Sequence, residues 1–97
     1  MSESPQEIDA AVARAADAGE RFVVATALEG EHTGSRLVVW PAGHTFGDLG
    51  WPRLNQRVAL YAEQLLERSV AVATVKPFDV PGRGKVAIRI EPRGENR

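Results

Sequence analysis

The sequence predicts an α+β fold, a two-layer sandwich in which two helices cover one face of a roughly four-stranded sheet. Two segments carry apolar residues at helical spacing, and four shorter segments are rich in β-branched residues or alternate in polarity. Their order is helix, strand, strand, helix, strand, strand, and strand runs broken by helices favour this class. A length of 97 residues suits one small core, so we expect residues 1–97 to form a single domain.

The first helix is predicted from Ser4 onward. Ser4 can cap the helix, Pro5 suits the first helical position, and Glu7 completes a capping box. Gly19 is a typical stop. The apolar stripe between them is mostly alanine, so the helix should pack closely and bury a modest area: Ile8, Ala11, Val12, Ala15 and Ala16.

Residues 21–29 and 36–40 predict two strands joined as a hairpin. The first is apolar on both faces, which is typical of an internal strand. A polar turn over residues 29–34 separates the two strands, and Pro41 ends the second.

The second half begins with a loop over residues 42–50, in which residues 44–46 can form a short strand. A helix is predicted over residues 52–68, with an inward stripe at helical spacing. Strands are predicted over residues 69–75 and 85–91, and the stretch 77–84 between them reads as the longest flexible connection. The inward stripe of the helix contains Leu54, Val58, Tyr61, Ala62 and Leu65.

Composition narrows the classes of protein. There is no cysteine, so disulfides, thiolate metal sites and a cysteine nucleophile are excluded. No apolar run approaches the roughly 20 residues that cross a bilayer, and the polar start is not a signal peptide, so we expect a cytoplasmic protein. The net charge of −1 divides into −5 over residues 1–35, +1 over 36–75 and +3 over 76–97. The basic end alternates with apolar residues and lacks stacking aromatics, which favours a solvated strand face over nucleic-acid binding.

The most informative stretch runs from residue 34 to residue 66. An apolar strand enters a glycine-punctuated loop, and the loop leads into a helix start. Backbone N–H groups at such a helix start can hold an anion or a polar heterocycle. We therefore take as candidate ligand-binding residues Gly34, Arg36, Gly43, His44, Gly47, Asp48, Gly50, Trp51, Arg53 and Asn55.

At residues 34–66 the sequence resembles the N-terminal domain of the XdhC/CoxI family. The resemblance as a whole covers roughly residues 5–70. The family pattern of glycine, small residue, basic residue and aliphatic run is similar to residues 34–39, and its later glycines are similar to Gly43, Gly47 and Gly50. The resemblance implies an accessory protein of xanthine dehydrogenase or carbon monoxide dehydrogenase that helps to mature the molybdenum cofactor. It also implies a molybdopterin-type ligand, and as partners a molybdenum-containing dehydrogenase or a separate dinucleotide-binding domain.

The sequence departs from the family pattern after Gly50. The family usually continues with two glycines, often a cysteine, then an aliphatic residue and a glutamate. Here Trp51 and Pro52 replace the glycines and remove close backbone approach. Arg53 replaces the cysteine and Asn55 the carboxylate. The chain therefore resembles a stand-alone, degenerate form of the module, and we expect no catalytic residue.

Each candidate side chain also has a plainer interpretation. His32 and His44 lack partners at metal-ligand spacing, so we expect no metal site, although His44 could act as a base. Arg36 and Arg53 form an anion pocket if both point at residues 47–50. Otherwise they are surface arginines paired with Asp48 or Glu29. Trp40 and Trp51 flank the loop and either stack on a ligand or fill a small core.

Two functions remain open from the sequence. The first is a non-catalytic accessory or binding module, which contacts a partner enzyme or a pterin or phosphate ligand through residues 43–55. The second is a structural or interaction protein that forms a homodimer with no small-molecule ligand. The second is motivated by Trp51 standing where a ligand would approach, and by strands that could lie exposed at sheet edges.

Overall fold

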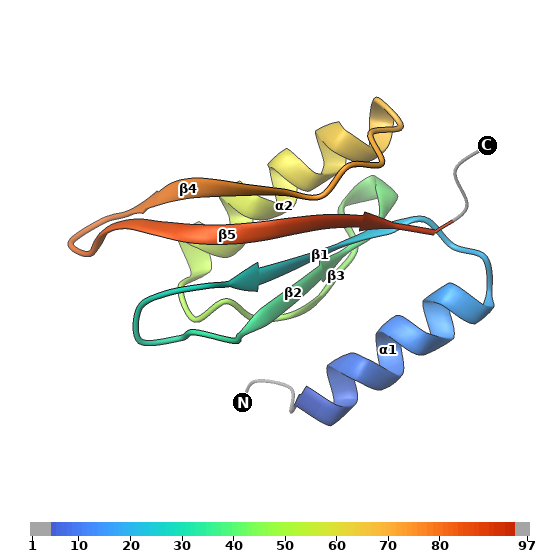
Figure 1. Cartoon of the computed structure of the whole chain (residues 1–97), viewed down its shortest axis with the longest axis horizontal. Coiled ribbons are helices and arrows are strands. Elements are labelled where there is room, and N and C mark those ends of the chain that lie inside the picture. The colour runs from blue at the N-terminus through green and yellow to red at the C-terminus, as the bar shows by residue number, and fades with distance from the viewer. Residues whose placement is uncertain (1–4, 95–97) are drawn as a thin grey trace.

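Two α-helices and a five-stranded antiparallel sheet make up the part of the chain that the computed structural model describes, residues 5–94 (Figure 1). The α+β class is confirmed. The predicted Ser4 cap lies outside the described residues. In chain order the elements are α1 (Pro5–Asp17), β1 (Phe22–Ala27), β2 (Arg36–Val39), the 3-10 turn η1 (Pro41–Gly43), β3 (Thr45–Gly47), α2 (Pro52–Glu67), β4 (Thr74–Val80) and β5 (Gly84–Arg93).

The strands lie in the order β3-β2-β1-β5-β4, and every neighbouring pair is antiparallel. The predicted hairpin is the β1–β2 pair, and β1 lies at the centre, as its two apolar faces indicated. The fifth strand is β3, one residue beyond the short strand expected at 44–46. It raises the expected count of four to five, because β3 pairs with β2 through Leu37 and Gly47 at one end and Val39 and Thr45 at the other.

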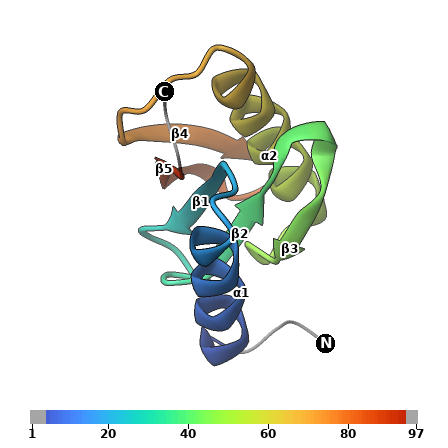
Figure 2. The same cartoon turned by 90° about the vertical axis from the view of Figure 1, so that its right-hand side faces the viewer.

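The layers differ from the expected sandwich, because the helices lie on opposite faces of the sheet (Figure 2). Val23 and Ala25 of β1 belong to the cluster packed against α2, whereas Phe22 and Val24 belong to the cluster packed against α1. Successive side chains of a strand point to opposite faces, so a central strand that is apolar on both faces needs cover on both. The alanine-rich stripe of α1 covers the second face, and its small side chains let the helix pack close to the sheet.

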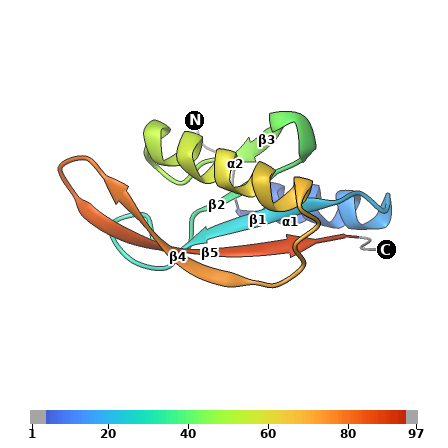
Figure 3. The same cartoon turned by 90° about the horizontal axis from the view of Figure 1, so that it is seen from above.

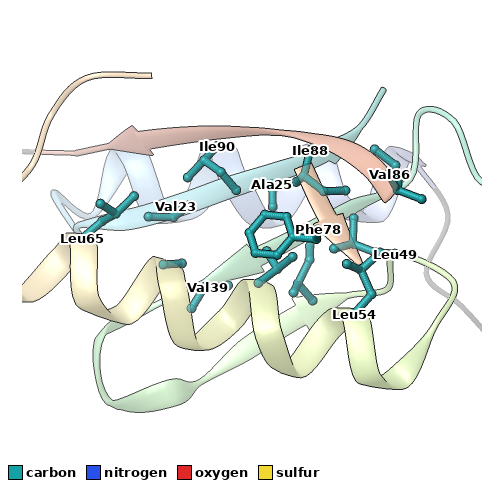
Figure 4. Close-up of a cluster of buried hydrophobic side chains, with 14 of the residues drawn as sticks. Val23, Ala25, Val39, Leu49, Leu54, Leu65, Phe78, Val86, Ile88 and Ile90 are labelled. Atoms are coloured by element: carbon teal, nitrogen blue, oxygen red, sulfur yellow. The ribbon is translucent and has the colours of Figure 1, made fainter. Parts of the chain in front are cut away.

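The main core lies between α2 and the sheet, and it draws side chains from four strands and from the loop before α2 (Figure 4). Leu54 and Val58 of α2, Leu49 of the loop and Ile88 of β5 are fully or almost fully buried. Each such side chain contributes about 1.5–3 kcal/mol through burial. Leu49 therefore anchors the glycine loop, residues 42–50, in the main core. No helix within residues 5–94 combines the length and apolar character needed to cross a membrane.

The strand β4 is displaced from its predicted position. We expected a strand over 69–75 and a flexible connection over 77–84, but β4 occupies Thr74–Val80 and only a short turn precedes β5. Pro77 pairs with Ala87 within the ladder. A proline is tolerated there because β4 is an edge strand, whose outer side needs no partner. The β4–β5 hairpin projects beyond the start of α2 (Figure 3).

Candidate functional site

The glycine loop before α2 is closed by hydrogen bonds among its own residues and Asn55. Asp48 Oδ1 accepts a bond of 2.7 Å from the Gly50 N–H and one of 2.8 Å from the Asn55 side-chain amide. The Leu49 N–H donates to Asn55 Oδ1 at 2.8 Å. Asn55 lies in the first turns of α2, so one side chain joins the loop to the helix that follows it. The loop is consequently held in one conformation.

The same bonds favour the charged form of Asp48. The amide donated by Asn55, and next the N–H of Gly50, lower the pKa of the Asp48 carboxyl below its ordinary value, and the nearby His32 adds a smaller effect in the same direction. Partial burial opposes these effects and does not outweigh them. Asp48 is therefore an anion at neutral pH, and its negative charge sits beside the Gly50 N–H.

Two glycines of the loop are required by close packing. Gly47 has a φ of 102°, and a Cβ there would overlap the carbonyl oxygen of Arg36 on the neighbouring strand. Gly50 also has a φ of 102°, and a Cβ there would overlap the His32 ring. Only glycine meets both demands, a positive φ and no side chain. These glycines shape the loop and bring two chain segments together.

The loop amides are accordingly not free to receive an anion. The N–H groups of Leu49 and Gly50 already donate to Asn55 and to Asp48. The N-terminal end of α2 follows directly, with Trp51 as a cap that makes no side-chain hydrogen bond and with Pro52 in the first turn.

A small pocket lies beside this loop, between the β2–β3 hairpin and α2. Its volume is 260 Å³, and it brings together three of the ten candidate residues, Gly43, Gly47 and Asn55. Leu37, Thr45, Gln56 and Ala59 complete the lining. The pocket is slightly smaller than the 300–1,000 Å³ usual for small-molecule sites.

Arg36 and Gly34 lie away from this pocket. Arg36 belongs to the α1 side of the sheet, and its guanidinium forms an ion pair with Asp9 of α1 at 2.6 Å. The acid of this ion pair was not among those expected from the sequence, Asp48 and Glu29. Gly34 closes the turn between β1 and β2, where its N–H donates to the Ala27 carbonyl. The structure does not bring Arg36 and Arg53 together.

Arg53 and Trp51 lie at the start of α2. Arg53 is exposed, and its side chain makes no hydrogen bond or ion pair within residues 5–94. Trp51 is half-buried and meets the His32 ring edge-on, with ring centroids 4.6 Å apart. Trp51 also lines a second pocket of 420 Å³ together with Arg83 and Lys85 of the β4–β5 hairpin. Nothing in the sequence signals the contact between His32 and Trp51, because only the fold places that turn beside the helix start.

His44 lies on the other side of this region, toward α1. Its ring centroid is 5.0 Å from that of Trp40, and both line a third pocket of 390 Å³ under α1. The indole N–H of Trp40 donates to Glu20 at 2.9 Å. Of the ten candidate residues, three line the pocket beside the loop, His44 and Trp51 each line another pocket, and the other five line none of these three pockets. Within residues 5–94, no three His, Cys, Asp or Glu side chains lie close enough together to hold a metal ion.

Comparison with known proteins identifies the family. No curated protein is similar enough to this chain to be matched. The family model described as "XdhC and CoxI family" matches residues 15–76, which is well over half of the 97 residues and includes the glycine loop and α2. The resemblance noted in residues 34–66 is thereby confirmed, and the chain belongs to the XdhC and CoxI family.

Proposed function

We propose that this chain is a non-catalytic accessory module that docks on a molybdenum enzyme during its maturation. Membership of the XdhC and CoxI family implies an accessory role in the maturation of molybdenum enzymes. The proposal adds the docking surface, which we define as Gly43, Gly47, Asp48, Gly50, Arg53 and Asn55. This surface lies on the η1 turn, β3, the loop between β3 and α2, and the start of α2.

The observation that carries the proposal is the closure of the glycine loop by Asp48 and Asn55. A loop whose amides are already bonded presents a fixed surface and does not have to be ordered when a partner binds. Such preorganisation lowers the entropic cost of association. Arg53 stands exposed beside this loop without an internal partner among the described residues, and arginine is enriched in protein interfaces.

A pterin or phosphate ligand is the second part of the proposal. It is supported by the 260 Å³ pocket, which Asn55 and two glycines line beside the docking surface. The bonded amides of Leu49 and Gly50 count against an anion held by the loop itself. A ligand would therefore depend on the polar side chains that line the pocket, Thr45, Asn55 and Gln56.

The partner is tested by measuring binding of the chain to a purified molybdenum hydroxylase, using biolayer interferometry. We expect Arg53→Glu to weaken binding at least tenfold. Arg89→Glu is the matched control, because Arg89 is also exposed and lies on β5, away from the docking surface. Equal binding by both variants and the unchanged chain would refute the docking surface. Calorimetry with molybdopterin tests the ligand separately, and the absence of heat would remove it.

A homodimer without a ligand is favoured by a different observation. Val72, just before the edge strand β4, and Val75, within it, expose 71% and 53% of their surface. An exposed edge with apolar side chains can pair with a second copy. Sedimentation velocity decides this: a monomer at 100 μM, roughly the concentration at which weak dimers form, excludes it.

A further inference from the structure

The pocket under α1 has the size of a ligand site and is partly lined by aromatic side chains. None of its lining residues belongs to the docking surface. It lies between α1 and the segment that runs from Trp40 through β3, with a volume of 390 Å³. That volume falls within the range of small-molecule sites. We call it the α1 pocket; His44 is the only docking candidate from the sequence that it contains.

One wall of the α1 pocket is aromatic. Trp40 lies between Phe22, at a centroid distance of 6.2 Å, and His44, at 5.0 Å. Phe22 is fully buried, so it supports the indole from the core side. Phe46 of β3 extends the wall, and Ala11 and Ala15 of α1 face it. Trp40 and Phe46 pack against the cluster that contains Ala15, and each remains partly exposed. A flat ring can lie against their exposed parts, because stacked and edge-on rings attract.

The wall is held in place before any ligand arrives. The indole N–H of Trp40 donates to Glu20 Oε1 at 2.9 Å. This bond fixes the orientation of the ring and leaves the second carboxylate oxygen of Glu20 as an acceptor. A ring that is already oriented gives up little rotamer freedom on binding.

The pocket carries one side chain of each charge. Arg14 of α1 lines it and is exposed, and it forms no ion pair within residues 5–94. Glu20 lines the same pocket just beyond the end of α1. A simple anion would meet the charge of Glu20, and a simple cation would meet that of Arg14. A ligand with both charges satisfies both, and its cationic end is also favoured near the C-terminal end of a helix.

We propose that the α1 pocket binds a small aromatic zwitterion, that is, an aromatic amino acid. The carboxylate of the ligand pairs with Arg14, the ammonium group pairs with Glu20, and the ring lies against Trp40 and His44. No bond is made or broken, so the site is one of binding and not of reaction. It stands on the opposite side of the sheet from α2.

The test uses L-phenylalanine as the probe and Trp40 as the reporter. In Trp51→Phe, Trp40 is the only tryptophan, so emission excited at 295 nm reports the α1 pocket alone. We expect a saturable change with a dissociation constant in the millimolar range or below, as a ligand of this size allows. Benzoate carries only the carboxylate and 2-phenylethylamine only the ammonium group. Each should bind about three- to fivefold more weakly than L-phenylalanine, because an exposed ion pair contributes only a modest energy.

Two variants separate the charges without disturbing the wall. Arg14→Gln should weaken the binding of L-phenylalanine about three- to fivefold and should not weaken the binding of 2-phenylethylamine. Glu20→Gln keeps an oxygen acceptor for the indole and should weaken L-phenylalanine but not benzoate. Circular dichroism checks that both variants are folded. An unchanged emission of Trp40 up to 20 mM L-phenylalanine, far above the millimolar range expected for this ligand, overturns the proposal, as does equal binding of benzoate or of both variants.

Discussion

Asn55 offers the sharpest test of how the glycine loop is held. Replacing it with alanine removes the acceptor of the Leu49 N–H and the amide donor to Asp48. The half-buried N–H loses its partner at a cost of about 1–2 kcal/mol. The bond to the exposed carboxylate contributes about 0.5 kcal/mol. Alanine regains about 0.5 kcal/mol through its higher helix propensity, so the expected net loss is about 1.5 kcal/mol.

For a chain of this length, such a loss lowers Tm by about 6–12 °C. Urea unfolding at pH 7 measures the change, and Gln56→Ala is the matched control, because Gln56 is the exposed neighbour on α2. A double-mutant cycle with Asp48→Ala isolates the bond between the two side chains, with an expected coupling of about 0.5–1 kcal/mol. A coupling near zero together with a Tm change below about 2 °C would show that Asn55 does not hold the loop.

The pH dependence of folding stability provides a second test of the bonds that Asp48 accepts. The pKa of Asp48 is lowered in the folded state, so its contribution to stability is present above the pKa of the unfolded chain. It is lost as the pH falls through the folded value. Asn55→Ala removes the largest cause of the shift, so the acid side of its stability profile should be flatter than that of the unchanged chain. Identical profiles below pH 5 would contradict the assignment of Asn55 as that cause.

Three further outcomes follow from the packing. Gly47→Ala should lose about 2–4 kcal/mol in urea unfolding, because the new Cβ meets the Arg36 carbonyl, whereas Gly82→Ala, at a positive φ in open space, should lose only about 1 kcal/mol; equal losses would argue against the close approach. Asp9→Asn should cost less than about 1 kcal/mol by the same measurement, because the ion pair with Arg36 is largely exposed on the Asp9 side. Leu54→Ala should cost about 3–5 kcal/mol and lower the thermal midpoint sharply, because Leu54 is 1% exposed in the main core; a loss below 1 kcal/mol would mean that the site collapses around the change.

The sequence by itself determined the helices, the central strand and the family. Apolar spacing and end signals are local properties, so α1 and α2 are found close to their predicted bounds. The two apolar faces of β1 predicted an internal strand, and β1 is the central strand of the sheet. The glycines of the loop were visible as a pattern, and the family match confirms the kinship that they indicated.

Only the tertiary structure decided which candidate residues meet. Residues 77–84 were predicted as a flexible connection, but Pro77 lies within β4 and is accommodated because β4 is an edge strand. Arg36 and His44 are close to the loop in sequence, yet strand alternation and the η1 turn send both toward α1. Asp48 and Asn55 are seven residues apart and bond to each other only because the loop folds back on α2. Local pattern fixes elements, whereas the direction of a side chain depends on register and on which face a distant helix covers.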